Sequence, residues 1–124
     1  TAHVRNGKKI LPDGERLWLD WQLVRRGRPW RDLTYFMVGT LTIEERRKHE
    51  RDLLALYREK LIETGANGVL GLDEIWEQHR RWIMLGVQAW VAALDRWGHT
   101  RLPIIERCFV AAEDLGTWKL LLGE

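Results

Sequence analysis

The sequence has a single cysteine, Cys108, and no apolar run that approaches the length of a membrane span. One cysteine excludes an intramolecular disulfide framework and a paired-cysteine zinc site, which fits a reducing compartment. The most apolar stretch, residues 82–94, is interrupted by Gln88 and falls short of the ~18 residues that cross a bilayer. We therefore expect no membrane span, a cytoplasmic location and an inert thiol in the core.

The chain also lacks the length for more than one ordinary domain. Its 124 residues can bury a real core, and 45% apolar with 31% charged residues is typical of a folded globular protein rather than a disordered tail. The chain begins at Thr1 without an initiator Met, so we expect a cut or incomplete chain. We interpret residues 1–124 as a single partial domain, with a hairpin and metal-site segment at 1–31 and a helical subdomain at 32–124.

Positive charge is concentrated at the start of the chain. Residues 1–31 contain eight Lys or Arg and three Asp or Glu, a balance of +5, whereas residues 32–124 contain 12 and 15, a balance of −3. A basic front suggests contact with something anionic, such as nucleotide phosphates or an acidic partner, and the alternative is a solvated face with ordinary ion pairs. Nucleic-acid binding is not expected, because +5 is modest and no nucleic-acid motif accompanies it.

The hydrophobic spacing predicts a mainly α (α+β) fold, with a short N-terminal β-hairpin followed by about four helices. The hairpin is expected from extended segments at 8–11 and 16–23 that flank the turn residues Pro12-Asp13-Gly14. Asp20 lies within the second segment, where a carboxylate is costly unless it is paired or faces a ligand.

From residue 32 onward, the spacing of the apolar residues changes to that of a helix and predicts the helices that follow. Asp32 is expected to cap a helix over 33–38 that Gly39 ends, and Thr42 with Glu45 forms a capping box for a helix that reaches Thr64. The strongest helical pattern covers 73–97 and contains four of the chain's eight tryptophans, the last of which is Trp97, directly before Gly98. A last helix is expected over 103–115, with a short turn around 118–122.

The residues that could carry chemistry are in the first 36 positions. His3 and Asn6 precede the hairpin, the run Leu19-Asp20-Trp21-Gln22 ends its second strand, and Asp32-Leu33-Thr34-Tyr35-Phe36 opens the first helix. An Asn before a hairpin and an Asp after it can converge on one cation, and Mg²⁺ needs only one or two protein oxygens when phosphates and water complete its shell. This ordered set resembles the second half of the C-terminal lobe of the aminoglycoside phosphotransferase and choline/ecdysteroid kinase-like family, and the resemblance implies the fold of the second half of a protein-kinase-like C-terminal lobe.

The resemblance implies roles for several residues. Asn6 and Asp20 would bind Mg²⁺ and, through it, a nucleoside triphosphate, and Asp32 would brace the catalytic loop. No catalytic residue is expected, because Thr1 stands where the family has its catalytic Asp and a hydroxyl cannot accept the acceptor's proton as a carboxylate does. Four aromatic or imidazole side chains would line an acceptor groove: Trp76, His79, Trp82 and Trp90.

Each of these residues also has an ordinary interpretation. Asp20 could form a salt bridge with Arg25 or Arg31, and Asn6 could cap a loop. His79 on an apolar face is typical of a hydrogen-bonded core histidine, and the tryptophans of the same helix are typical of packing.

Two functional hypotheses result. In the first, the chain is a fragment or degenerate remnant of a kinase-like phosphotransferase that moves the γ-phosphoryl group of ATP or GTP to a small-molecule hydroxyl. The nucleotide-binding N-terminal lobe of the family has no counterpart in these residues, so we expect no activity from this chain alone, and we expect that a separate lobe, a partner chain or self-association covers it. Its cofactors would be Mg²⁺ and nucleotide, or none in this fragment. The alternative is a non-catalytic helical interaction module that docks through its Trp-rich helix and basic N-terminal face.

Overall fold

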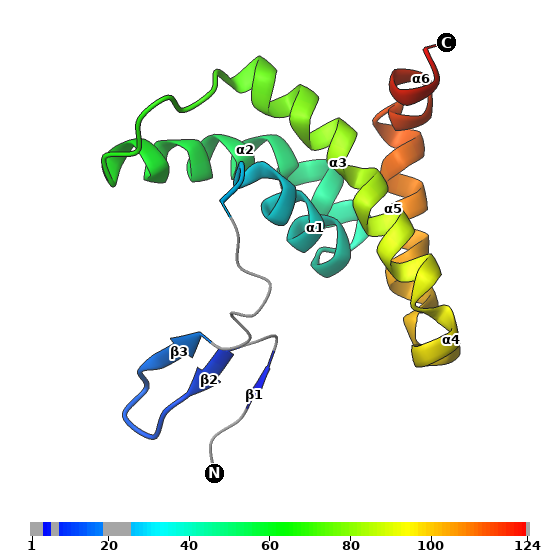
Figure 1. Ribbon diagram of the computed structural model, residues 1–124, viewed down its shortest axis with the longest axis horizontal. Coiled ribbons are helices and arrows are strands. Elements are labelled where there is room, and N and C mark those ends of the chain that lie inside the picture. The colour runs from blue at the N-terminus through cyan, green and yellow to red at the C-terminus, as the bar shows by residue number, and fades with distance from the viewer. Residues whose placement is uncertain (1–3, 6–7, 19–25, 124) are drawn as a thin grey trace.

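The computed structural model describes residues 4–5, 8–18 and 26–123 (Figure 1). The chain begins with three short strands, β1 (Val4–Arg5), β2 (Lys8–Ile10) and β3 (Arg16–Trp18). They form an antiparallel sheet in the order β1-β2-β3, in which Lys9 lies opposite Leu17.

The turn between β2 and β3 is held by local hydrogen bonds. The backbone N–H of Leu11 donates to the carbonyl of Glu15 at 2.9 Å, and the N–H of Glu15 donates to the Asp13 carboxylate at 3.0 Å. Gly14 has φ of 87°, in the left-handed region that glycine occupies without steric cost. The Pro-Asp-Gly sequence therefore reverses the chain where its turn chemistry predicts.

Most of the described chain is helical. Six α-helices and a 3-10 helix follow in this order: α1 (Trp30–Thr40), α2 (Ile43–Glu63), α3 (Leu72–Ala92), α4 (Leu94–Trp97), η2 (Gly98–Arg101), α5 (Leu102–Asp114) and α6 (Thr117–Leu122). None of the helices in this part of the chain combines the length and the apolar character that a membrane crossing needs.

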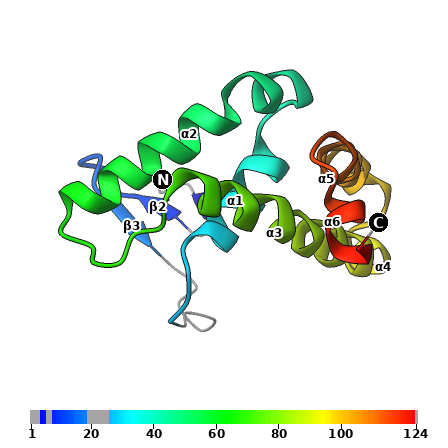
Figure 2. The same ribbon diagram turned by 90° about the horizontal axis from the view of Figure 1, so that it is seen from above.

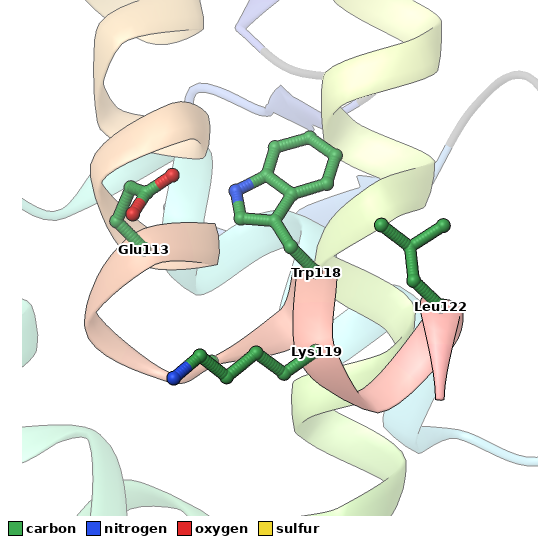
Figure 3. A pocket seen from close by; sticks show the side chains of 5 residues that line it. Glu113, Trp118, Lys119 and Leu122 are labelled. Carbon is green, nitrogen blue, oxygen red and sulfur yellow. The ribbon is translucent and has the colours of Figure 1, made fainter. Parts of the chain in front are cut away.

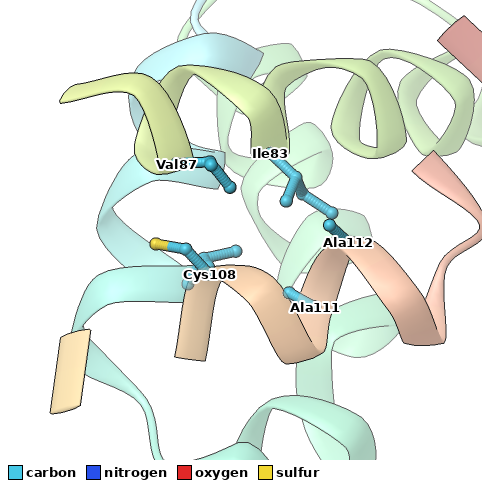
Figure 4. Close-up of a cluster of buried hydrophobic side chains, with 6 residues drawn as sticks. Ile83, Val87, Cys108, Ala111 and Ala112 are labelled. Atoms are coloured by element: carbon cyan, nitrogen blue, oxygen red, sulfur yellow. The ribbon is translucent and has the colours of Figure 1, made fainter. Parts of the chain in front are cut away.

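Helix α3 is the central element of the helical part. It runs from the neighbourhood of α2 to that of α5 and α6, and it packs along α1 (Figure 2). Two clusters of buried side chains lie along it. One joins α1, α3 and α5 and consists of Val38, Ile83, Val87, Cys108, Ala111 and Ala112 (Figure 4). The other joins α1, α2 and α3 and consists of Trp30, Met37, Leu54 and Ile75.

Helices α3 and α5 approach each other closely at Gly86. A Cβ atom built on Gly86 would lie 3.1 Å from the Cys108 Sγ, which is tighter than ordinary packing, so the missing side chain is what lets the helices meet. Burial raises the pKa of the Cys108 thiol to about 11. The thiol therefore stays protonated near neutral pH, in agreement with the expected inert core role.

The predicted fold class is wrong in its balance of elements. The described chain is mainly helical, with six α-helices rather than about four. The strands are two or three residues long and belong to a three-stranded sheet rather than to a simple hairpin, and the predicted second strand is described only to Trp18. The α+β designation is therefore corrected to a helical fold.

Helix boundaries also differ from the prediction. Helix α1 begins at Trp30 after Pro29, whose fixed φ of −68° suits a helix start, so Asp32 lies inside the first turn and is not the cap. Gly39 lies inside α1, which ends at Thr40. The predicted helix over 73–97 divides at Ala93 into α3 and α4, and the turn expected around 118–122 is helix α6.

The capping box at the start of α2 is confirmed. The Thr42 hydroxyl accepts the backbone N–H of Glu45 at 3.2 Å, and the Glu45 carboxylate accepts the backbone N–H of Thr42 at 2.9 Å. Two amides without helical partners are thereby satisfied, which fixes where this 21-residue helix begins.

Candidate functional site

A buried polar network joins four helices where α1, α2, α3 and α5 meet. His79 of α3 is fully buried, and its Nδ1 lies 2.9 Å from the hydroxyl of Thr34 on α1. Its Nε2 lies 3.4 Å from the carboxylate of Glu50 on α2. Both ring nitrogens thus have partners inside the protein, as the core interpretation of this histidine predicts, and the ring has no face open to a substrate.

Arginine side chains continue the network to α5. Arg46 is 1% exposed and donates from Nη1 to Glu50 at 2.9 Å, and its Nη2 donates to Asp114. Asp114 also accepts two hydrogen bonds from Arg47, at 2.7 and 2.8 Å, in a bidentate pair. The Arg47 hydrogen bond is the main reason why the pKa of Asp114 lies below its ordinary value.

Glu50 is charged despite its burial. Burial by itself would raise the pKa of Glu50, but the hydrogen bonds from His79 and Arg46, together with their charges, outweigh it and hold the pKa below the ordinary value. Removing one partner from such a pair leaves an uncompensated buried charge, at a cost of about 3–5 kcal/mol. The network therefore fixes the four helices against one another, and we call it the connector. It consists of Thr34, Arg46, Glu50, His79 and Asp114.

The burial of Arg46 and Glu50 in this network is not among the features predicted from the sequence. They are four residues apart on α2, and Leu54 continues the same spacing into the second buried cluster. The available signal is an Arg-Glu pair that continues the apolar stripe, although charged residues are almost never fully buried unless they are paired.

The four predicted acceptor contacts do not meet in one groove. Trp76 packs against the second cluster, where the Arg51 guanidinium lies 3.7 Å from the centre of its ring. Trp90 stacks on Tyr35 of α1 with ring centres 6.1 Å apart. Because Trp76 and Trp90 are 14 residues apart on α3, about 21 Å of helix separates them, and one small acceptor cannot contact both.

Trp82 lies elsewhere on α3 and lines a pocket of about 300 Å³ with residues of the segment that enters α1. The other lining residues include Arg26, Arg28, Arg31 and Asp32, and we call this site the basic pocket. Asp32, the predicted brace, has a side chain that is 77% exposed and pairs with Arg31, Nε to Oδ1, at 3.0 Å. The structure thus brings two predicted site residues, Asp32 and Trp82, to one place.

A second pocket lies between α5 and α6 and has a volume of about 390 Å³. Figure 3 shows Glu113 and Lys119 near its rim and the indole of Trp118 between the helices. The indole Nε1 of Trp118 is buried and has no acceptor among the described residues. Glu113 and Lys119 place opposite charges on the walls of this pocket, so the pocket has no net electrostatic preference for an anion or a cation.

The predicted metal site cannot be placed. Asn6 and Asp20, and Thr1 at the position of the missing base, lie outside the described residues. Within residues 4–5, 8–18 and 26–123, no three His, Cys, Asp or Glu side chains gather in a way that could hold a metal ion.

Comparison with known proteins gives one family match. The model of the DUF1679 family, described as "Uncharacterized oxidoreductase dhs-27", matches residues 15–83, which is more than half of the chain. No curated protein and no solved structure matches the chain.

Proposed function

Because the chain belongs to the DUF1679 family, which is related to choline/ecdysteroid kinase-like proteins, we propose that it is the C-terminal helical part of a kinase-like small-molecule phosphotransferase. The family match carries this proposal, since its span includes both Asp20 and the Asp32-Leu33-Thr34-Tyr35-Phe36 helix start. The whole enzyme would transfer a γ-phosphoryl group from ATP or GTP to a hydroxyl acceptor in the cytoplasm.

The proposed roles of this chain are binding and positioning. Asn6 and Asp20 would hold Mg²⁺, which supplies charge neutralisation at the nucleotide phosphates. The connector of buried polar side chains would keep α1, and the segment that leads into it, in a fixed position relative to α3. Rigid supports of this kind matter because transfer depends on the alignment of the reacting groups.

The same proposal predicts that the chain alone is inactive. Thr1 replaces the family's catalytic carboxylate, and these 124 residues include no counterpart of the Gly-rich loop and lysine that clamp the nucleotide. A separate lobe or partner chain, or a second copy, would have to provide them. The acceptor is a small molecule with a hydroxyl group.

A non-catalytic interaction module is the second candidate. The Trp-rich helix α3 is packed by α1, α2, α5 and α6, which leaves little of it for a partner. What favours this candidate is a set of exposed apolar side chains at the far end of α2 and the start of α3, namely Leu56, Ile62 and Leu72. The word oxidoreductase in the family's description is not extended to this chain, whose described residues contain no parallel strand-helix-strand unit for a dinucleotide.

Titration with magnesium and ATP separates the two candidates. The phosphotransferase proposal expects saturable Mg-dependent ATP binding by calorimetry that is lost in Asp20→Asn, because the amide cannot replace the carboxylate charge. Asp52→Asn, an exposed position on α2, is the matched control and should bind as the unaltered chain does. Equal binding by Asp20→Asn would contradict the proposed role of Asp20, and absence of binding together with stable oligomers would favour the interaction module.

An assay of phosphoryl transfer tests the inactivity separately. With ATP, Mg²⁺ and a panel of hydroxyl compounds, ADP formation by the pure chain should stay at the background rate. Transfer above background by the chain alone, abolished in Asp20→Asn, would show that Thr1 and the absence of a nucleotide clamp do not prevent catalysis.

A further inference from the structure

The basic pocket combines three arginines with an indole. Arg26 and Arg28 come from the segment before α1, Arg31 comes from the first turn of α1, and Trp82 comes from the middle of α3. The two elements are far apart in sequence and are held together by the buried contacts between α1 and α3. The pocket is therefore part of the fold and not a chance grouping on one flexible segment.

The charge of the pocket is not balanced among the described residues that line it. Three guanidinium groups and the carboxylate of Asp32 give a formal balance of +2. Arg31 has its own partner in Asp32, whereas Arg26 and Arg28 are exposed and form no ion pair with any other residue that the structure describes. Two guanidinium groups are thus available for an anion from solution.

Trp82 adds an apolar surface to the pocket. Its ring is half-buried in the wall of the pocket, and its Nε1 is buried without a hydrogen-bond acceptor among the described residues. Because the Nε1 atom is buried, the part of Trp82 that a ligand in the pocket meets is its ring rather than this donor. The ring face offers a flat apolar surface to the remainder of such a ligand.

We infer that the basic pocket binds a small organic phosphate, with the phosphate on Arg26, Arg28 and Arg31 and the body of the ligand against Trp82. A phosphate monoester carries close to two negative charges at pH 7, which matches the balance of +2, whereas a carboxylate would neutralise only half of it. Guanidinium groups suit phosphate because their planar forks donate two parallel hydrogen bonds.

The volume supports a ligand larger than phosphate alone. A pocket of about 300 Å³ has room for roughly ten waters at ~30 Å³ each, which is enough for a phosphate and a small ring. The inference needs neither Mg²⁺ nor Asn6 nor Asp20, so it does not depend on the proposed phosphotransferase function.

The test is a titration of the full chain with phenyl phosphate in Mg-free buffer of low ionic strength, followed by ¹⁵N NMR. The indole N–H signal of Trp82, identified by its loss in Trp82→Phe, should shift to saturation. Inorganic phosphate should bind more weakly because it cannot use the ring, and phenol should not bind because it lacks the charge. Added salt should weaken the binding of phenyl phosphate.

Charge-removing variants show whether the arginines are responsible. Arg28→Gln, at an exposed position where folding should not change, is expected to weaken phenyl phosphate binding at least about tenfold through loss of a charge-assisted hydrogen bond. Lys48→Gln makes the same change of charge at an exposed position of α2 outside the pocket and should leave the affinity within about twofold. Arg26→Gln should behave as Arg28→Gln does.

Several results would overturn the inference. These are no saturable shift of the Trp82 signal, phenol binding as tightly as phenyl phosphate, or inorganic phosphate binding as tightly as its phenyl ester. Equal loss of affinity in Arg28→Gln and Lys48→Gln would also overturn it, since it would reduce the effect to the net charge of the chain.

Discussion

Asp114 and Glu50 show how single carboxylates can make folding depend on pH. Asp114 accepts hydrogen bonds from Arg46 and Arg47, and Glu50 lies between Arg46 and His79. The pKa of each carboxyl group is lower in the folded chain than its ordinary value. Protons therefore bind more tightly to these groups in the unfolded chain than in the folded one.

The sign of the pH effect follows directly. A depressed folded-state pKa stabilises the fold fully above the unfolded values, about 3.9 for Asp and 4.3 for Glu, and this stabilisation is lost as the pH falls through the folded values. We predict that the free energy of unfolding, measured with urea from pH 7 to pH 2, decreases below about pH 4. Asp114→Asn should reduce this acid-dependent part, because its side chain no longer titrates.

Asp73→Asn provides the control for this prediction, since Asp73 is exposed and forms no ion pair with another described residue. It should keep the acid dependence of the unaltered chain. An identical slope for Asp114→Asn and the unaltered chain would mean that this carboxylate does not contribute through titration.

At the scale of single residues, sequence reasoning succeeded where a side chain acts through its neighbours in the chain. The Thr42–Glu45 capping box and the Asp13–Gly14 turn depend on contacts no more than four residues apart, and both are present. The Arg46–Asp114 contact joins residues 68 positions apart. No local pattern contains that information, because it depends on how α2 and α5 pack.

At the scale of elements, helices α3 and α5 approach each other closely at Gly86. Gly86 allows it, and the Cys108 Sγ occupies the space that a side chain would need. Alanine at this position would favour the helix intrinsically by about 1 kcal/mol, but the new methyl group would press on a buried sulfur that has little room to move.

We predict that Gly86→Ala lowers the free energy of unfolding by about 1–2 kcal/mol, because overpacking outweighs helix propensity. In a Cys108→Ala background the same change should become neutral or stabilising, since the obstructing sulfur is gone. Urea unfolding of the two single variants and the double variant measures the coupling. Additive effects would show that the helices separate freely at this point.

Element boundaries were the least predictable part of the helical chain. Asp32 is a good cap by residue type, but Pro29 already provides a helical φ three residues earlier, and α1 begins there. Gly39 is predicted to end the helix, yet α1 continues to Thr40 because Val38 and Met37 are buried in the two clusters. Packing of neighbouring residues thus overrides the preference of one glycine.

At the scale of the whole molecule, both described clusters of buried side chains lie in the helical part. We predict that a chain starting at Arg26 keeps its helical circular dichroism and melts within roughly 5 °C of the full chain, since both clusters remain in it. A chain ending at Gly116 is the comparison, because it loses the buried Thr117 and the packed Trp118. It should melt at a clearly lower temperature.

The reverse order of melting temperatures would place the stabilising contacts in the first 25 residues.

The helical class of the whole molecule could be deduced from the hydrophobic periodicity, because each amphipathic stripe is a local pattern. The acceptor groove could not, because Trp76, Trp82 and Trp90 were grouped by sharing one helix, whereas α1 and α2 cover different parts of it.

Membership of α1 and α3 in both clusters has a consequence for how the helical part comes apart. Met37 and Ile75 belong to one cluster, and Val38 and Ile83 belong to the other. Unfolding of either cluster therefore disrupts α1 and α3, which the other cluster also needs. The two clusters should therefore unfold cooperatively, and the slowly exchanging amide hydrogens of α1 and α3 should lose their protection from hydrogen exchange in one step.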